Sequence, residues 1–74
     1  MLVKITGTVD SVKQMEKDGR SWTEVFLNQR GEQQKAKVKL YSGAIPKLDE
    51  TITFEGVVVA GAFNGSPYKF IRVN

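Results

Sequence analysis

The sequence contains no cysteine and no histidine among its 74 residues. Without cysteine the chain can form neither a disulfide nor a thiolate metal site, and without histidine it lacks the commonest metal ligand and general base. The acidic residues show no metal-ligand spacing, and no glycine-rich phosphate loop opens a helix. We therefore expect no enzyme and no metal or other cofactor.

The chain also has no long apolar run. No segment approaches the roughly 18 consecutive apolar residues of a membrane span, and the residues after Met1 lack the basic start and apolar stretch of a signal peptide. We expect no membrane association and a cytoplasmic location. A chain of this length predicts one domain, residues 1–74, near the lower size limit for a single core.

Strict alternation predicts two strands between Arg20 and Tyr41. One face of each strand is aliphatic: Val25 and Leu27 in the first, and Ala36, Val38 and Leu40 in the second, residues 34–41. The opposite faces carry rings and lysines: Trp22, Glu24 and Phe26, then Lys35, Lys37, Lys39 and Tyr41. The aliphatic face predicts a core, because a strand pair must bury one side.

Three further strands follow from the same pattern. The first begins near Val3 and contains Gly7, which suits a bulge or a sharp bend. The other two cover residues 50–60 and 67–73. Asp18-Gly19 and Asn64-Gly65 predict two-residue hairpin turns. The run at residues 57–59 is apolar on both faces, which predicts either burial on both sides or contact with another subunit.

Five strands, with one irregular connection over residues 42–49, predict an all-β fold. We expect a five-stranded antiparallel Greek-key barrel of the OB-fold type, with protruding β-hairpins and little or no helix. Large rings beside lysines indicate a partner that has flat faces and negative charge. Single-stranded nucleic acid meets both requirements.

Short motifs on three strands resemble the filamentous-phage gene V type of single-stranded DNA-binding protein. They are Asp18-Gly19-Arg20-Ser21-Trp22, Lys37-Val38-Lys39-Leu40 and Gly61-Ala62-Phe63-Asn64-Gly65-Ser66. The resemblance implies sequence-independent coating of single-stranded DNA during phage DNA replication, in the cytoplasm of a bacterial host. It also implies that Arg20 contacts phosphate, that Trp22 stacks on a base, that Lys39 faces the DNA backbone and that Phe63 reaches the DNA. The region 57–66 would help to build a homodimer.

Two alternatives use the same residues. The chain could be a structural OB-fold module that mediates protein–protein interaction, in which case the lysines only confer solubility, or it could bind RNA on the same platform. For Phe70 a place in the core or in an interface is the favoured interpretation. The candidate nucleic-acid-binding residues are Arg20, Trp22, Phe26, Lys35, Lys37, Lys39, Tyr41, Phe63 and Tyr68.

Overall fold

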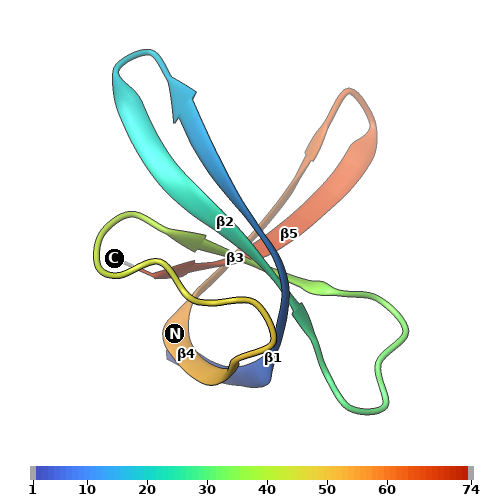
Figure 1. The fold of residues 1–74 in the computed structure, drawn as a ribbon. Coiled ribbons are helices and arrows are strands. Elements are labelled where there is room, and N and C mark those ends of the chain that lie inside the picture. The colour runs from blue at the N-terminus through green and yellow to red at the C-terminus, as the bar shows by residue number, and fades with distance from the viewer. Residues whose placement is uncertain (1, 74) are drawn as a thin grey trace.

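Two tight turns join the four longest strands of the computed structural model, which describes residues 2–73 (Figure 1). Asp18 and Gly19 have φ angles of 53° and 77°, and Asn64 and Gly65 have φ angles of 51° and 80°. A type I′ turn needs positive φ at both central residues, so these angles confirm the two predicted hairpins. The strands are β1 (Leu2–Lys17), β2 (Arg20–Asn28), β3 (Ala36–Leu40), β4 (Thr51–Phe63) and β5 (Ser66–Val73).

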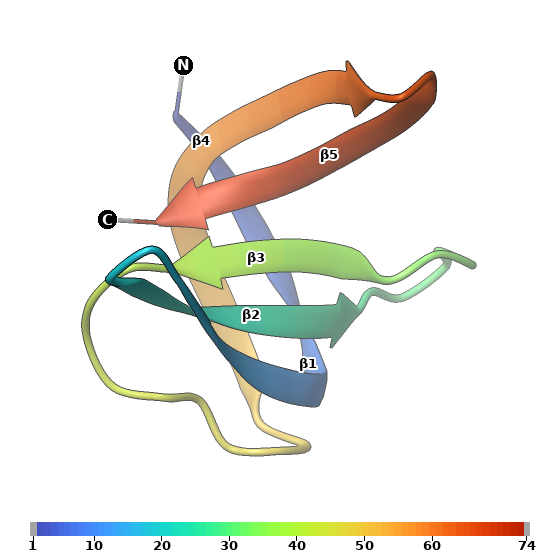
Figure 2. The same cartoon turned by 90° about the horizontal axis from the view of Figure 1, so that it is seen from above.

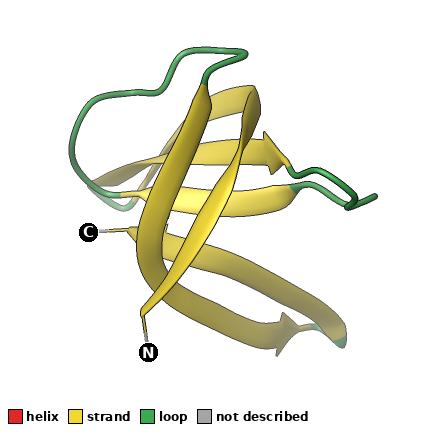
Figure 3. Cartoon of the chain, turned by 90° about the horizontal axis from the view of Figure 1, so that it is seen from below, coloured by secondary structure: helices red, strands yellow, loops and turns green. Residues whose placement is uncertain are grey.

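The five strands form one sheet in the order β1-β2-β3-β5-β4, and β4 pairs with β1, so the sheet closes on itself. The structure confirms the all-β class, and no helix is present within residues 2–73 (Figure 3). The first half of β1 pairs with β4 and its second half with β2, which leaves both hairpins projecting and diverging (Figures 1 and 2). Their projection agrees with a radius of gyration of 12.3 Å, slightly above the roughly 11 Å expected for a globule of this length.

One pair of strands corrects the expectation of an antiparallel fold. β3 and β5 run parallel, with Val38 opposite Ile71 and Leu40 opposite Val73. The other four pairings are antiparallel. A closed ring with an odd number of strands cannot alternate direction all the way round, so at least one parallel pair is required. The pair falls where two strands distant in the sequence meet.

The core consists of aliphatic residues on the predicted inward positions together with one ring. Val9, Val25, Leu27 and Val38 have no exposed surface. Each fully buried side chain of this size contributes roughly 1.5–3 kcal/mol relative to an exposed one. Leu40, Phe54 and Ile71 complete the buried cluster. The predicted inward faces of the second and third strands are therefore confirmed.

The bend in β1 does not arise as we expected. The register shift lies between Val9 and Ser11, not at Gly7. Gly7 pairs regularly with Ile52, but a methyl group on it would lie 2.8 Å from the carbonyl oxygen of Asn28. A glycine is needed there because β2 approaches the backbone of β1 closely, which is another recognised reason for glycine in a strand.

The connection from β3 to β4, residues 41–50, is irregular and is tied to the bulge of β1. The amide of Val9 donates to the carbonyl oxygen of Glu50 at 2.9 Å, and the amide of Asp49 donates to the carbonyl oxygen of Val9 at 2.8 Å. These bonds satisfy the Val9 backbone where β1 changes partner from β4 to β2. Within residues 2–73 the structure contains no helix long and apolar enough to cross a membrane.

Candidate nucleic-acid interface

The outward side of β2, β3 and β5 carries rings and cations in rows that run across the strands. Residues directly opposite each other in a sheet share a face, so the register gives the rows. Met15 lies opposite Trp22, and Tyr41 follows β3 at the same level. The next row is Lys13, Glu24, Lys39 and Arg72, and the third is Ser11, Phe26, Lys37 and Phe70. We name these three rows the aromatic–cationic face.

Lys39 lies at the centre of this face, between two rings. Its Nζ atom is 4.2 Å from the centroid of Phe70 and 5.4 Å from the centroid of Trp22. Both distances lie within the range of a cation–π contact. Among residues 2–73 the ion pairs involve other lysines, so Lys39 has no carboxylate partner there. Its charge is held in place by rings and is available to an anion.

Glu24 is the buried acid of the face, and its side chain is only 10% exposed. A buried carboxylate must be paired and hydrogen-bonded to be tolerated. Here Trp22 donates its indole N–H to Glu24 Oε2 at 3.1 Å, and Lys37 Nζ lies 3.6 Å from Glu24 Oε1. Glu24 therefore fixes the orientation of the indole ring and neutralises part of the Lys37 charge.

The rings of the face form two groups. The centroids of Trp22 and Tyr41 are 6.4 Å apart with planes inclined at 34°, and those of Tyr68 and Phe70 are 6.3 Å apart with planes at 19°. Trp22, Phe26 and Phe70 are half-buried, which anchors them, whereas Tyr41 and Tyr68 are exposed. Anchored rings with accessible faces can act as a stacking platform, because every nucleobase has a flat face.

The other predicted binding residues lie outside these rows. Arg20 is exposed at the tip of the β1–β2 hairpin, opposite Lys17. Phe63 is 73% exposed beside the turn of the β4–β5 hairpin. Lys35 precedes β3, which begins only at Ala36, and its Nζ atom lies 2.7 Å from Asp10 Oδ2. The structure thus brings together Trp22, Phe26, Lys37, Lys39 and Tyr41. Tyr68 joins this group because its ring lies beside that of Phe70. Arg20, Lys35 and Phe63 lie elsewhere.

The pairing of Lys35 with Asp10 predicts a pH effect on stability. Lys35, and then Asn28 at 3.1 Å, donate hydrogen bonds to the Asp10 carboxylate, and these bonds hold its pKa below the ordinary value. Because the pKa is lower in the folded state, the pairing stabilises the fold above the unfolded-state pKa of about 4 and the contribution is lost as the pH falls through the folded-state pKa.

We expect Asp10→Asn to lower the free energy of unfolding at pH 7 and to have progressively less effect below about pH 4. Urea denaturation of both proteins across this range measures the difference. Lys35→Gln removes the largest cause of the pKa shift and should reproduce the loss at pH 7. A difference between wild type and Asp10→Asn that stays constant down to pH 2 would contradict the role given to this pair.

Sequence reasoning did not include Glu24, Phe70 or Arg72 among the candidate binding residues. The alternation placed Glu24 on the correct face but did not indicate that its side chain is buried. That burial depends on the Trp22 indole and on Lys37 of the next strand. Phe70 and Arg72 lie on the face rather than in the core, since β5 pairs with β3 in a register that aligns Arg72 with Lys39. Their shared alternation with Tyr68 was the available signal, but the register was needed to interpret it.

The aromatic–cationic face can stack flat rings and neutralise anions. It carries four cations, Lys13, Lys37, Lys39 and Arg72, against the single carboxylate of Glu24. Within residues 2–73 no group of three or more potential metal-ligating side chains comes together. No family model, no curated protein and no solved structure matches this chain.

Proposed function

We propose that this chain is a sequence-independent single-stranded DNA-binding protein of the OB-fold type that coats DNA during phage replication. The observation that carries the proposal is the position of Lys39 between Trp22 and Phe70, with Arg72 and Lys37 as neighbours. Stacking on a ring contributes about 1–3 kcal/mol per base, and cations beside the rings neutralise phosphates. The sheet order and the short, helix-free β3–β4 connection support the OB-fold assignment.

Duplex DNA fits the face less well than a single strand. Stacking on protein rings needs bases that are free of their own stack, whereas a duplex presents mainly phosphates and base edges. The rings here are part of the sheet surface, and rings of the first and third rows lie on either side of the cations of the second row. A flexible strand can place bases and phosphates alternately on such a surface, so single strands should be bound in preference to duplex.

Titration of the protein with oligo-dT, followed by Trp22 fluorescence, tests the proposal. Trp22 is the only tryptophan, so the signal reports this site alone. We expect saturable quenching, and affinity that falls as salt rises from about 50 to 200 mM, with a log–log slope of about −0.7 for each phosphate neutralised. Matched RNA and duplex DNA serve as competitors. Failure to bind any oligonucleotide at low salt would exclude the proposal and favour a protein-binding module.

Glu24→Gln tests the part played by the buried acid. The amide oxygen can still accept from the Trp22 N–H, but the variant removes a negative charge from the face and frees Lys37. We expect tighter binding to oligo-dT by several-fold and a log–log salt slope steeper by about 0.7, because one more counterion is displaced. Unchanged affinity and slope in a folded variant would show that Lys37 does not meet phosphate.

The proposal includes a homodimer formed through residues 57–66. Val58 is 42% exposed, so the apolar run at residues 57–59 is not buried on both sides within one chain, and Phe63 on the same strand is 73% exposed. Among residues 2–73, β1 pairs with β4 only as far as Val57, and no other strand pairs with that side of β4 beyond it. A second copy that extends the sheet along this edge would pair its backbone groups and cover part of the exposed apolar surface. Phe63→Asp should shift the molar mass measured by light scattering from dimer to monomer.

A further inference from the structure

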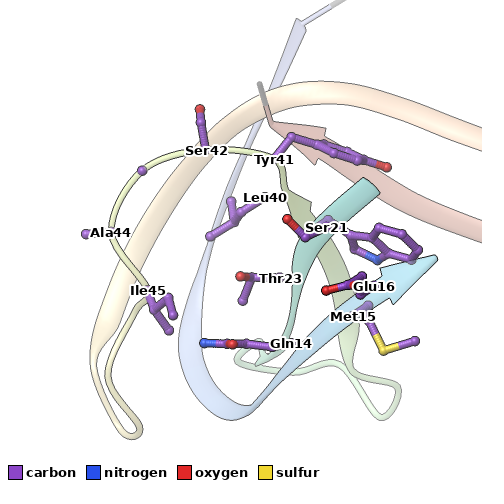
Figure 4. Close-up of a pocket in the computed structure, with 12 residues that line it drawn as sticks. Gln14, Met15, Glu16, Ser21, Thr23, Leu40, Tyr41, Ser42, Ala44 and Ile45 are labelled. Carbon is purple, nitrogen blue, oxygen red and sulfur yellow. The ribbon is translucent and has the colours of Figure 1, made fainter. Parts of the chain in front are cut away.

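A groove of about 460 Å³ opens beside the aromatic–cationic face, between the β1–β2 hairpin and the loop that follows β3 (Figure 4). Successive residues of a strand point to opposite sides. Gln14, Glu16 and Thr23 reach into the groove from the hairpin (Figure 4), and Met15 and Trp22, at the alternate positions, also contribute to its lining. The groove therefore adjoins the stacking platform, because Trp22 and Tyr41 also contribute to its lining.

The walls of the groove differ in chemistry. The hairpin wall is polar, because Gln14 pairs with Thr23 and Glu16 pairs with Ser21. Leu40 and Ile45 contribute an apolar surface from the end of β3 and from the loop. Among the side-chain hydrogen bonds and ion pairs of residues 2–73, none engages Gln14, Glu16, Ser21 or Thr23. An apolar surface next to unused hydrogen-bonding groups is typical of a site for a flat polar ring.

The order of donors and acceptors on the hairpin wall selects among the bases. The Glu16 carboxylate offers two acceptors and no donor, and the Gln14 amide beside it offers a donor. Guanine presents two adjacent donors, N1–H and the N2 amino group, followed by the O6 acceptor. Adenine, cytosine and thymine each have only one donor on this edge that the carboxylate could accept from. The position next to it, where guanine has its second donor, is an acceptor: a ring nitrogen in adenine and cytosine, and a carbonyl oxygen in thymine. That acceptor would face the carboxylate and be repelled.

We propose that this groove is a guanine-selective base subsite, in which Glu16 accepts from N1–H and the N2 amino group while Gln14 donates to O6. The base ring would lie on Leu40 and Ile45. This inference rests on the proposed single-strand binding, because the strand that stacks on Trp22 must turn one base around the hairpin edge. Lys17 and Arg20 at the hairpin tip can neutralise the adjacent phosphates. Binding is then sequence-independent along most of the strand and selective at one position.

The test compares oligo-dT of about nine nucleotides, within the site size of a single OB fold, with the same strand carrying one central guanine. Fluorescence anisotropy of a labelled strand gives both dissociation constants. We expect the guanine strand to bind about tenfold more tightly, the value for one good bidentate pair. Hypoxanthine, which lacks the N2 amino group, should lose most of this gain. Central adenine or cytosine should give none.

Glu16→Gln should abolish the preference for guanine while keeping oligo-dT affinity within about twofold, because an amide offers one acceptor in place of two. Glu55→Gln, an exposed acid on β4, is the matched control and should retain the preference. Guanine and thymine strands that bind equally while oligo-dT binds normally would overturn the subsite alone. A preference that survives Glu16→Gln would also overturn it. Absence of all oligonucleotide binding would overturn the proposed function as well.

Discussion

Trp22→Ala is expected to weaken binding to oligo-dT by about 10-fold to 100-fold. The indole is the largest ring of the aromatic–cationic face, and the loss of one stacked base corresponds to about 1–3 kcal/mol. The variant also removes the indole N–H that donates a hydrogen bond to Glu24 Oε2 at 3.1 Å, and one of the two rings that contact Lys39. Anisotropy of a labelled oligonucleotide measures the loss, since the variant has no tryptophan.

Trp22→Phe separates the two contributions of this side chain. Phenylalanine keeps a stacking ring and a surface for Lys39 but cannot donate to Glu24, so the affinity should fall by only a few-fold. Met15→Ala is a second control, because Met15 lies directly opposite Trp22 and carries no ring. If Trp22→Ala folds, as judged by circular dichroism, and binds within twofold of wild type, base stacking at this position is excluded.

Gly56→Ala is expected to lower the free energy of unfolding by about 3 kcal/mol, at the upper end of the usual cost of overpacking. Gly56 is buried in β4, where a methyl group would overlap the carbonyl oxygen of Arg72 and lie 3.0 Å from the Ile71 side chain. The two strands would have to separate. This loss is a large part of the total for a small domain, which is of order 5–10 kcal/mol.

Urea denaturation followed by Trp22 fluorescence measures the effect of Gly56→Ala. Glu55→Ala is the matched control on the same strand, because its ion pair with Lys4 is exposed and 3.9 Å long, and such pairs contribute about 0–1 kcal/mol. The displaced β5 also carries Phe70 and Arg72, so DNA affinity should fall with stability. A Gly56→Ala protein as stable as wild type would mean that β4 and β5 can move apart without cost.

Local chemistry explains which elements could be predicted. The turns at Asp18-Gly19 and Asn64-Gly65 depend on the φ angles of two adjacent residues, and the inward positions of Val25 and Val38 depend only on alternation within one strand. The predicted ends of the strands were less accurate. β4 continues to Phe63 rather than ending near Ala60, because it keeps pairing with β5 up to the turn.

Contacts between strands explain most of what could not be predicted. Lys35 was grouped with Lys37 and Lys39 by its spacing, yet it precedes β3 and pairs with Asp10, a residue brought near by the bulge in β1. The burial of Glu24 depends on a lysine of the neighbouring strand and on the indole two residues earlier. The Asp10 partner of Lys35 and the Lys37 partner of Glu24 each come from another strand, so the sequence around Lys35 or Glu24 does not indicate them.

Residues adjacent along the chain are sufficient to predict the all-β class, the two hairpins, the core positions and the presence of rings among lysines. The parallel pairing of β3 with β5, the position of Lys39 between Trp22 and Phe70, and the groove beside the hairpin appear only in the folded chain. These features depend on the register of strands that are distant in sequence, which closure of the whole sheet imposes and no single segment encodes.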